Sequence, residues 1–190
     1  LHDRPTKPGL HVVAVADTSS NEPVLAAALI YERFRRGDAA VQGPGFEVLR
    51  VPFESEATAE RPDAAEAAND RFAFPLFVPP GGPFRDVMII LNGLNDSSYR
   101  KFFPWAASIA RAGVPALIFP SAFLMNRRPR EWITPTATER ALQARLQVAP
   151  DSATPINAVL SQRVAHNPRV LLQDALHTVH DLQRLLESLR

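Results

Sequence analysis

The stretch from Asp86 to Trp105 sets the strongest limits on how this chain can fold; it reads DVMIILNGLNDSSYRKFFPW. It begins with five apolar residues, Val87 to Leu91, which lack the polar alternation of a half-exposed strand. Such a run predicts a central strand that is buried on both faces of a parallel sheet. A polar turn, residues 92–98, follows at once, and its Asn, Asp and Ser side chains favour a helix that starts near Tyr99. The stretch therefore predicts a strand, a tight turn and a helix N-terminus in succession, an arrangement at which open α/β proteins bind ligands.

The residues that follow complete a strand–helix–strand unit. Their apolar spacing predicts that the helix continues to residue 112, where Gly113 ends it, and that Val114 to Phe119 forms a second buried strand. Two strands joined through a helix in this way pair in parallel. We therefore predict an α/β fold with three layers (αβα), in which a mostly parallel sheet lies between two layers of helices.

Further strands and helices are predicted around this unit. The stretch from Phe72 to Val78 contains Pro75, which cannot donate a backbone hydrogen bond, so we expect it at a sheet edge or in an extended arm. The last segment, Pro168 to Arg190, has the apolar spacing of a long amphipathic helix. Similar patterns predict strands at residues 10–16 and 46–53 and helices at residues 24–36, 134–148 and 156–165.

The length and composition favour one folding unit. At 190 residues with 46% hydrophobic residues, the chain can bury one sizeable core, so residues 1–190 are predicted to form a single α/β domain or the N-terminal part of one. Residues 54–70 are acidic, rich in alanine and nearly free of large apolar side chains, which predicts a solvent-exposed connector. Residues 120–165 are interpreted as a loop or cap-like insertion.

Charge and composition argue against several classes of partner. Lysine and arginine together number 21 and acidic residues number 20, so the net charge gives no reason to expect nucleic acid or an anionic membrane. The chain has no cysteine, which excludes disulfides, thiolate nucleophiles and thiolate metal sites. No apolar run approaches the ~18 residues of a membrane-spanning helix. We predict no nucleic-acid partner, no transmembrane segment and no cofactor.

The loop after the second strand of the unit combines aromatic, amide and guanidinium groups. Its candidate substrate-binding residues are Met125, Asn126, Arg127, Arg128 and Trp132. Such a mixture at the carboxyl end of a strand is more typical of a binding edge than of a plain connector. The alternative is a surface loop that packs its aromatic rings on the domain and leaves its arginines in solvent. A guanidinium within ~15 Å of the turn at residues 92–98 would favour the first interpretation, because an arginine and one small ligand span that distance.

Two histidines on the predicted last helix are candidates for catalysis or metal binding. His177 and His180 are three residues apart, and Asp174 and Asp181 lie beside them. On one helix face, such residues are able to hold a metal ion or to pair a base with a carboxylate. No HExxH pattern and no third ligand accompanies them. We therefore interpret the histidines as polar-face or interface residues and predict no metal site.

The buried strand, the Asn92-Gly93 turn, the helix with its Pro-Trp-Ala sequence and the MNRRP loop at residues 125–129 together resemble the N-terminal half of an α/β-hydrolase. The resemblance covers residues 72–190 and is greatest to an uncharacterised group with a similar LNGLN turn and MNR-P loop. In that superfamily the turn after the third strand usually begins with His-Gly and supplies one backbone N–H of the oxyanion hole. The resemblance implies that Leu94, directly after Asn92-Gly93, is the N–H donor, with Asn95 as a second candidate.

The sequence departs from that superfamily at the nucleophile. No serine lies in a G-x-S-x-G pattern, which the strained nucleophile elbow requires. The resemblance places the elbow after the helix that ends at Arg190, with the acid and the histidine later still. We therefore expect the N-terminal part of a serine hydrolase-like protein, incomplete at its C-terminal end and inactive alone, whose substrate is a small-molecule ester, thioester or amide.

A function from another class stays open beside this one. The alternative is a non-catalytic α/β module that binds a small molecule or a partner at the carboxyl edge of the sheet. Beyond a small molecule, the expected partners are a second copy of the chain or the missing C-terminal half. A G-x-S-x-G farther along the gene would favour the enzyme, and a natural stop after Arg190 would favour the binding module.

Overall fold

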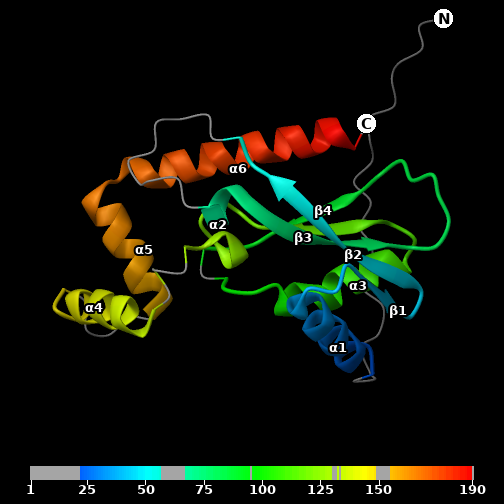
Figure 1. Ribbon diagram of the computed structural model, residues 1–190, viewed down its shortest axis with the longest axis horizontal. Coiled ribbons are helices and arrows are strands. Elements are labelled where there is room, and N and C mark those ends of the chain that lie inside the picture. Colours follow the sequence, from blue (N-terminus) through cyan, green and yellow to red (C-terminus); the bar gives the residue numbers. More distant parts are fainter. Residues whose placement is uncertain are drawn as a thin grey trace, which may run out of the picture.

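The computed structural model describes residues 22–56, 67–94, 96–129, 132, 134–148 and 155–189. A five-stranded sheet is covered by helices on both faces (Figure 1). The strands are β1 (Ala40–Gly43), β2 (Phe46–Glu54), β3 (Arg71–Val78), β4 (Met88–Leu91) and β5 (Ala116–Phe119). The helices are α1 (Glu22–Arg36), α2 (Ala67–Asp70), α3 (Phe103–Arg111), α4 (Pro135–Leu146), α5 (Pro155–His166) and α6 (Arg169–Ser188), with 3-10 turns η1 (Arg100–Phe102) and η2 (Met125–Arg127).

The sheet is mixed and mostly antiparallel, so the prediction of a mostly parallel, α/β-hydrolase-like sheet is wrong. The strand order is β1-β2-β3-β5-β4, in which β1, β2, β3 and β5 pair antiparallel in succession. The β1–β2 hairpin turns through two residues, with Gly45 at φ +79°, and β3 returns along the full length of β2. The strand–helix–strand unit is confirmed, because β4 and β5 are parallel and α3 joins them.

The prediction that Val87 to Leu91 forms the central strand is also wrong. β4 is the outer strand next to β5, and its Met88 and Leu91 side chains are 43% and 48% exposed. An uninterrupted apolar run does not distinguish a doubly buried strand from an edge strand that has a helix over each face. The strand that is buried throughout is β5, the second strand of the unit.

The stretch with Pro75 lies inside the sheet and not at its edge, which corrects a third prediction. β3 has β2 on one side and β5 on the other. Its ladder with β5 is short and covers Leu76 and Phe77. Pro75 lies one residue before this ladder, so its missing N–H interrupts no hydrogen bond to β5. An inner strand therefore tolerates proline at this position.

Two hydrophobic clusters, one on each face of the sheet, hold the layers together. On one face α1 and α3 pack around Phe103, whose ring lies 5.2 Å from Tyr31 and 5.0 Å from Phe77 between ring centroids. On the other face α6 packs through Leu185 over the aromatic rings around Phe119. Figure 1 shows α6 along one side of the sheet and α1 with α3 on the opposite side.

Most helices predicted from apolar spacing are confirmed, and they extend the fold beyond the sheet. α1, α4, α5 and α6 agree with the predicted ranges to within about two residues at each end, and the helix expected from Tyr99 begins as η1 and continues as α3. α4 packs on α5 and α5 reaches α6, so the two helices project from the sheet in the region interpreted as an insertion (Figure 1). The strand predicted at residues 10–16 lies outside the described residues. No helix in the described ranges is long and apolar enough to cross a membrane.

Candidate functional site

A cavity of about 350 Å³ lies at the carboxyl ends of the parallel strands β4 and β5. It is open on one side and lined by the turn after β4, the loop after β5 and the N-terminal half of α6. The lining residues are Asn92, Gly93, Leu94, Ser121, Ala122, Phe123, Leu124, Leu171, Asp174, Ala175 and Thr178. The carboxyl ends of neighbouring parallel strands are the usual place for a ligand in sheets of this kind, and the turn singled out in the sequence forms part of the cavity.

The hydrogen bonds of the turn after β4 are made within the protein. Asn92 Oδ1 accepts a hydrogen bond from the Ser121 N–H at 2.7 Å, which joins the two loops of the cavity. The Gly93 N–H donates to Asp96 Oδ2 at 2.7 Å, and the same carboxylate forms an ion pair with Lys101. The Gly93 N–H is therefore engaged with a side chain of the protein and not open to an anion. Asn95, the second oxyanion candidate, lies outside the described residues.

The polar groups of α6 that reach the cavity also have partners. Thr178 Oγ1 accepts a hydrogen bond from the Ala122 N–H at 2.9 Å and donates to the Asp174 carbonyl oxygen at 2.9 Å. These bonds attach the loop after β5 to α6. With the Thr178 hydroxyl and the Ala122 N–H engaged in this way, the cavity offers a ligand mainly apolar side chains, among them Leu94 and Phe123.

The loop after β5 is held in an unfavourable backbone conformation. Phe123 and Met125 have φ values of +58° and +51°, in the left-handed region that costs residues other than glycine about 1–3 kcal/mol each. The surroundings impose this shape, because the Phe123 N–H donates to Asn69 Oδ1 at 2.9 Å and the Phe123 ring stacks on Trp132 with centroids 5.4 Å apart. Strain of this kind clusters at ligand-binding loops, and Phe123 lines the cavity.

Behind the loop lies a fully buried ion pair between Arg127 and Asp181. The Arg127 guanidinium donates to Asp181 Oδ2 at 2.7 Å, and neither side chain is exposed. It also donates to the carbonyl oxygens of Asn69 at 3.0 Å and Pro120 at 3.2 Å, and it lies 4.2 Å above the ring of Phe72. Burial lowers the pKa of Arg127, and the Asp181 carboxylate opposes this shift. Arg127 thus joins α2, β5 and α6.

Ser55, His177 and Asp181 meet at the same ion pair, but not in the geometry of a catalytic triad. Ser55 Oγ lies 2.6 Å from Asp181 Oδ1 and 2.5 Å from His177 Nε2. Because a carboxylate accepts only, the serine proton goes to Asp181, and His177 Nε2–H donates to Ser55 Oγ. A nucleophile requires the reverse transfer, from serine to histidine. The three side chains are buried, so we assign the cluster a structural role.

None of the five predicted substrate-binding residues lines the cavity. Met125 is buried in the core under α3, and Asn126 accepts a hydrogen bond from Tyr99. Arg127 is buried with Asp181. Arg128 is half-buried, a position that lowers the pKa of its guanidinium, and its Nη2 lies 3.4 Å from the Asp96 carbonyl oxygen. The Arg128 guanidinium therefore lies within the ~15 Å of the turn that the sequence analysis set. The Trp132 ring stacks on Phe123, which lines the cavity.

Two predictions about polar segments need correction. His177 was expected on a polar face or at an interface, but it is buried together with Asp181. Ser55 and Asn69, at the ends of the predicted solvent-exposed connector, are buried as well. A signal for the helix was present in the sequence. His177 and Asp181 lie at helical spacing from the apolar Val170 and Leu185, which are on the buried face. Ser55, Asn69 and Thr178 were not identified from the sequence, because their partners are 54 or more residues away.

Tyr99 provides a prediction about pH, because burial raises the pKa of its phenol well above the ordinary tyrosine value. The folded state favours the neutral phenol, so this stabilisation is complete below the unfolded pKa of about 10 and is lost as pH rises from there through the folded value. We expect the free energy of unfolding from urea titrations to fall between pH 9 and pH 11, less steeply in Tyr99→Phe by up to about 1.4 kcal/mol per pH unit. Equal slopes for the two proteins would contradict the assignment.

Comparison with known proteins gives a family but no function. A model described as a family of unknown function (DUF6051) matches residues 52–190, which include the cavity and the buried ion pair. No curated protein and no solved structure gives a significant match.

Proposed function

The chain belongs to DUF6051, a family of unknown function, and we propose that it binds a small, largely apolar molecule in the cavity at the ends of β4 and β5. The cavity is the observation that carries this proposal. Its volume of about 350 Å³ lies within the range of small-molecule sites, ~300–1,000 Å³. Its lining residues come from the turn after β4, the loop after β5 and α6, so the cavity forms only when these three segments pack together.

The hydrogen bonds around the cavity favour a neutral ligand over an anionic one. The Gly93 N–H, which lies at the turn and could donate to an anion, is already engaged with the Asp96 carboxylate. The N–H groups of Ser121 and Ala122 are likewise engaged, with Asn92 and Thr178. A neutral apolar group needs none of these donors, because its burial is driven by the area removed from water.

The proposal for these residues is binding, whereas the hydrolase function that the sequence resemblance implies takes its nucleophile, acid and histidine from after Arg190. Ser121 is the serine of the lining, and no histidine is present among the described residues that line the cavity. A serine nucleophile needs an adjacent base within hydrogen-bond reach. His177, the nearest candidate along α6, has its Nε2 directed to Ser55 in the buried cluster.

The test is a titration with Nile red, a neutral apolar dye whose fluorescence rises on leaving water. We expect saturable binding to the wild-type chain and at least about a tenfold weaker Kd in Ala175→Trp, since a fold-change of ten corresponds to ~1.4 kcal/mol. Ala175 lines the cavity and is exposed at its mouth, so an indole there occupies the space. The matched control is Leu176→Trp, one residue along the helix and outside the lining, which should bind like wild type.

Two outcomes would overturn the proposal. The first is wild-type affinity in Ala175→Trp with its helical content and melting temperature retained, because the dye would then lie elsewhere. The second is the absence of saturable binding to the wild-type chain. A titration with an anionic naphthalene sulfonate dye separately tests the preference for a neutral ligand, and we expect it to bind more weakly than Nile red.

A further inference from the structure

The chain contains a single Asn-Gly dipeptide, Asn92-Gly93. In such a pair the backbone nitrogen of the glycine attacks the side-chain Cγ of the asparagine, because no Cβ hinders its approach. The nitrogen gives up its proton to solvent, the new N–Cγ bond closes a succinimide ring, and the Cγ–Nδ2 bond breaks to release ammonia. Water then opens the ring on one side or the other, which leaves aspartate or isoaspartate. This deamidation needs no cofactor and no partner.

The turn after β4 presents this dipeptide to water, and its backbone conformation does not require glycine. Gly93 is exposed. It is not among the described glycines that have a positive φ. A Cβ built on it would lie 3.4 Å from Asp96 Oδ2, at the short end of ordinary contacts. Alanine therefore fits at this position without backbone strain and serves below as a test variant.

Hydrogen bonds hold both reacting groups in the folded protein. The Gly93 N–H donates to Asp96 Oδ2 at 2.7 Å, and the Gly93 carbonyl oxygen accepts from the Asp96 N–H at 3.1 Å. The Asn92 side chain accepts from the Ser121 N–H at 2.7 Å and donates to the Gly93 carbonyl oxygen at 3.0 Å. Ring closure requires the Gly93 nitrogen to lose its proton and to turn toward Asn92 Cγ. Both changes break the bond to Asp96.

We propose that Asn92-Gly93 is a site of spontaneous deamidation and that Asp96 blocks the reaction in the folded protein. The Asp96 carboxylate stabilises the protonated nitrogen as its hydrogen-bond acceptor. It also opposes formation of the amide anion that attacks, because the anion would place two negative charges side by side. The Asp96 side chain is only 11% exposed, so solvent screens this repulsion little.

The reaction would alter the cavity. Asn92 and Gly93 line it, and Asn92 Oδ1 joins the turn after β4 to the loop after β5 through the Ser121 N–H. In the succinimide the side-chain carbonyl of residue 92 becomes part of a ring, and isoaspartate adds a methylene to the backbone. Both products displace the oxygen that Ser121 binds. The bond between Gly93 and Asp96 therefore determines how long the cavity keeps its shape, whatever the cavity binds.

The first test compares the rate of deamidation in the folded chain with the rate in a synthetic peptide of residues 86–100, both at neutral pH. Trypsin releases the same peptide from the protein, and tandem mass spectrometry assigns the acid product to Asn92 or to Asn95. We expect Asn92 to react at least about tenfold more slowly in the folded wild type, a difference of ~1.4 kcal/mol in the barrier. Equal rates would overturn the proposal.

Asp96→Ala tests the assigned residue. We expect Asn92 to react at least about tenfold faster in this variant than in wild type, and the double variant with Gly93→Ala should lose the acceleration. The matched control is Lys101→Ala, which removes the ion pair but leaves the carboxylate and its bond to Gly93, so it should react at the wild-type rate. Wild-type stability of Asn92 in a folded Asp96→Ala variant, or equal acceleration in both variants, would overturn the role of Asp96.

Amide hydrogen exchange gives a second test that does not depend on how the Asp96 variant folds. Base-catalysed exchange removes the same Gly93 proton that ring closure requires. In wild-type protein we expect NMR in D₂O to show this N–H exchanging at least about tenfold more slowly than in the peptide, although Gly93 is exposed. Exchange at the rate of the peptide would overturn the proposal. Neither test uses a dye, so their outcome is independent of ligand binding in the cavity.

Discussion

Replacing Arg127 with methionine is expected to lower the free energy of unfolding by about 3–5 kcal/mol. The change leaves the Asp181 carboxylate in a position with no exposure and without its cationic partner. It also removes the donors to the carbonyl oxygens of Asn69 and Pro120. Removing one member of a buried ion pair is costly because the remaining charge is neither hydrated nor compensated.

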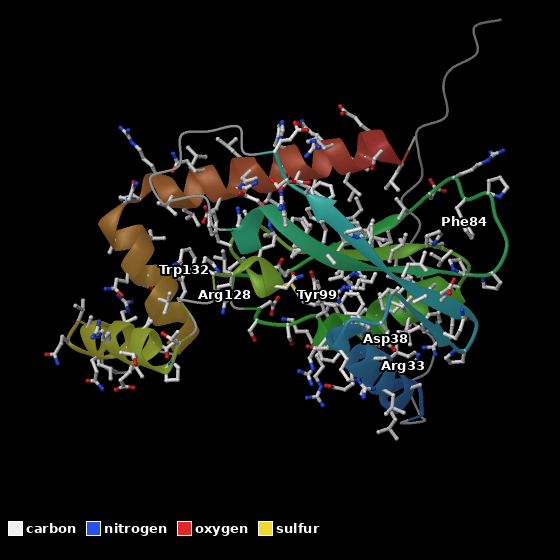
Figure 2. All side chains as sticks on the ribbon, viewed as in Figure 1. Arg33, Asp38, Phe84, Tyr99, Arg128 and Trp132 are labelled. Atoms are coloured by element: carbon white, nitrogen blue, oxygen red, sulfur yellow. The ribbon has the colours of Figure 1, made fainter. Side chains whose placement is uncertain are left out.

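Urea unfolding followed by circular dichroism measures this loss, and the chain supplies a matched control. Arg33→Met breaks the ion pair with Asp38, which lies at the C-terminal end of α1 (Figure 2). Those side chains are 51% and 35% exposed, so the change should cost less than about 1 kcal/mol. Similar losses in the two variants would contradict the assigned role of Arg127.

A double variant separates the desolvated charge from the lost contacts. Arg127→Met combined with Asp181→Leu leaves no unpaired charge, and replacement of a buried pair by apolar residues is often close to neutral. We expect the double variant to be more stable than Arg127→Met alone. If it is less stable by the sum of the two single losses, the hydrogen bonds to the backbone matter more than the charge.

The local pattern of the sequence was sufficient for single elements but not for the order of strands. The unit from β4 through α3 to β5 was predicted because a crossover and its two strands are encoded within residues 84–120. The positions of β3 and β4 in the sheet depend on pairings between distant segments. Pro75 illustrates the limit, since proline excludes a ladder at one position only, and the short β3–β5 ladder avoids that position.

The candidate site shows the same division between local and distant information. The turn at residues 92–94 was identified because a strand end, glycine and helix caps are adjacent in the chain. The functions of Arg127 and His177 were not predictable, because an arginine after a strand and a histidine on a helix are normally solvated. Their burial depends on Ser55 and Asn69, which come from the other end of the matched region and show no sequence pattern of their own.

The buried ion pair and the cavity are connected through Asn69 and the loop after β5. Asn69 binds the Phe123 N–H on the cavity side and the Arg127 guanidinium through its carbonyl oxygen on the buried side. The strained loop between them is thus held from both directions. Rigid support of this kind fixes the shape of a binding site before a ligand arrives, which lowers the entropic cost of binding.

The aromatic cluster under α6 is expected to be as important for stability as the ion pair. Phe119, the last residue of β5, is fully buried, and its ring centroid lies 5.4 to 5.6 Å from those of Phe53, Phe72 and Phe74. Truncating a buried phenylalanine removes its transfer free energy and leaves a cavity. We expect Phe119→Ala to lower the free energy of unfolding by about 3–5 kcal/mol.

Phe84→Ala is the control, because Phe84 is 39% exposed on the loop before β4, at the far end of the molecule from α4 (Figure 2). Its loss should be within about 0.5 kcal/mol, as for most surface substitutions. Phe72 contacts both the Phe119 ring and the Arg127 guanidinium, so the losses in Phe119→Ala and Arg127→Met should not add. Coupling energies between neighbouring sites are about 0.5–3 kcal/mol. Strict additivity in urea titrations of the double variant would show that the ion pair and the aromatic cluster stabilise α6 independently.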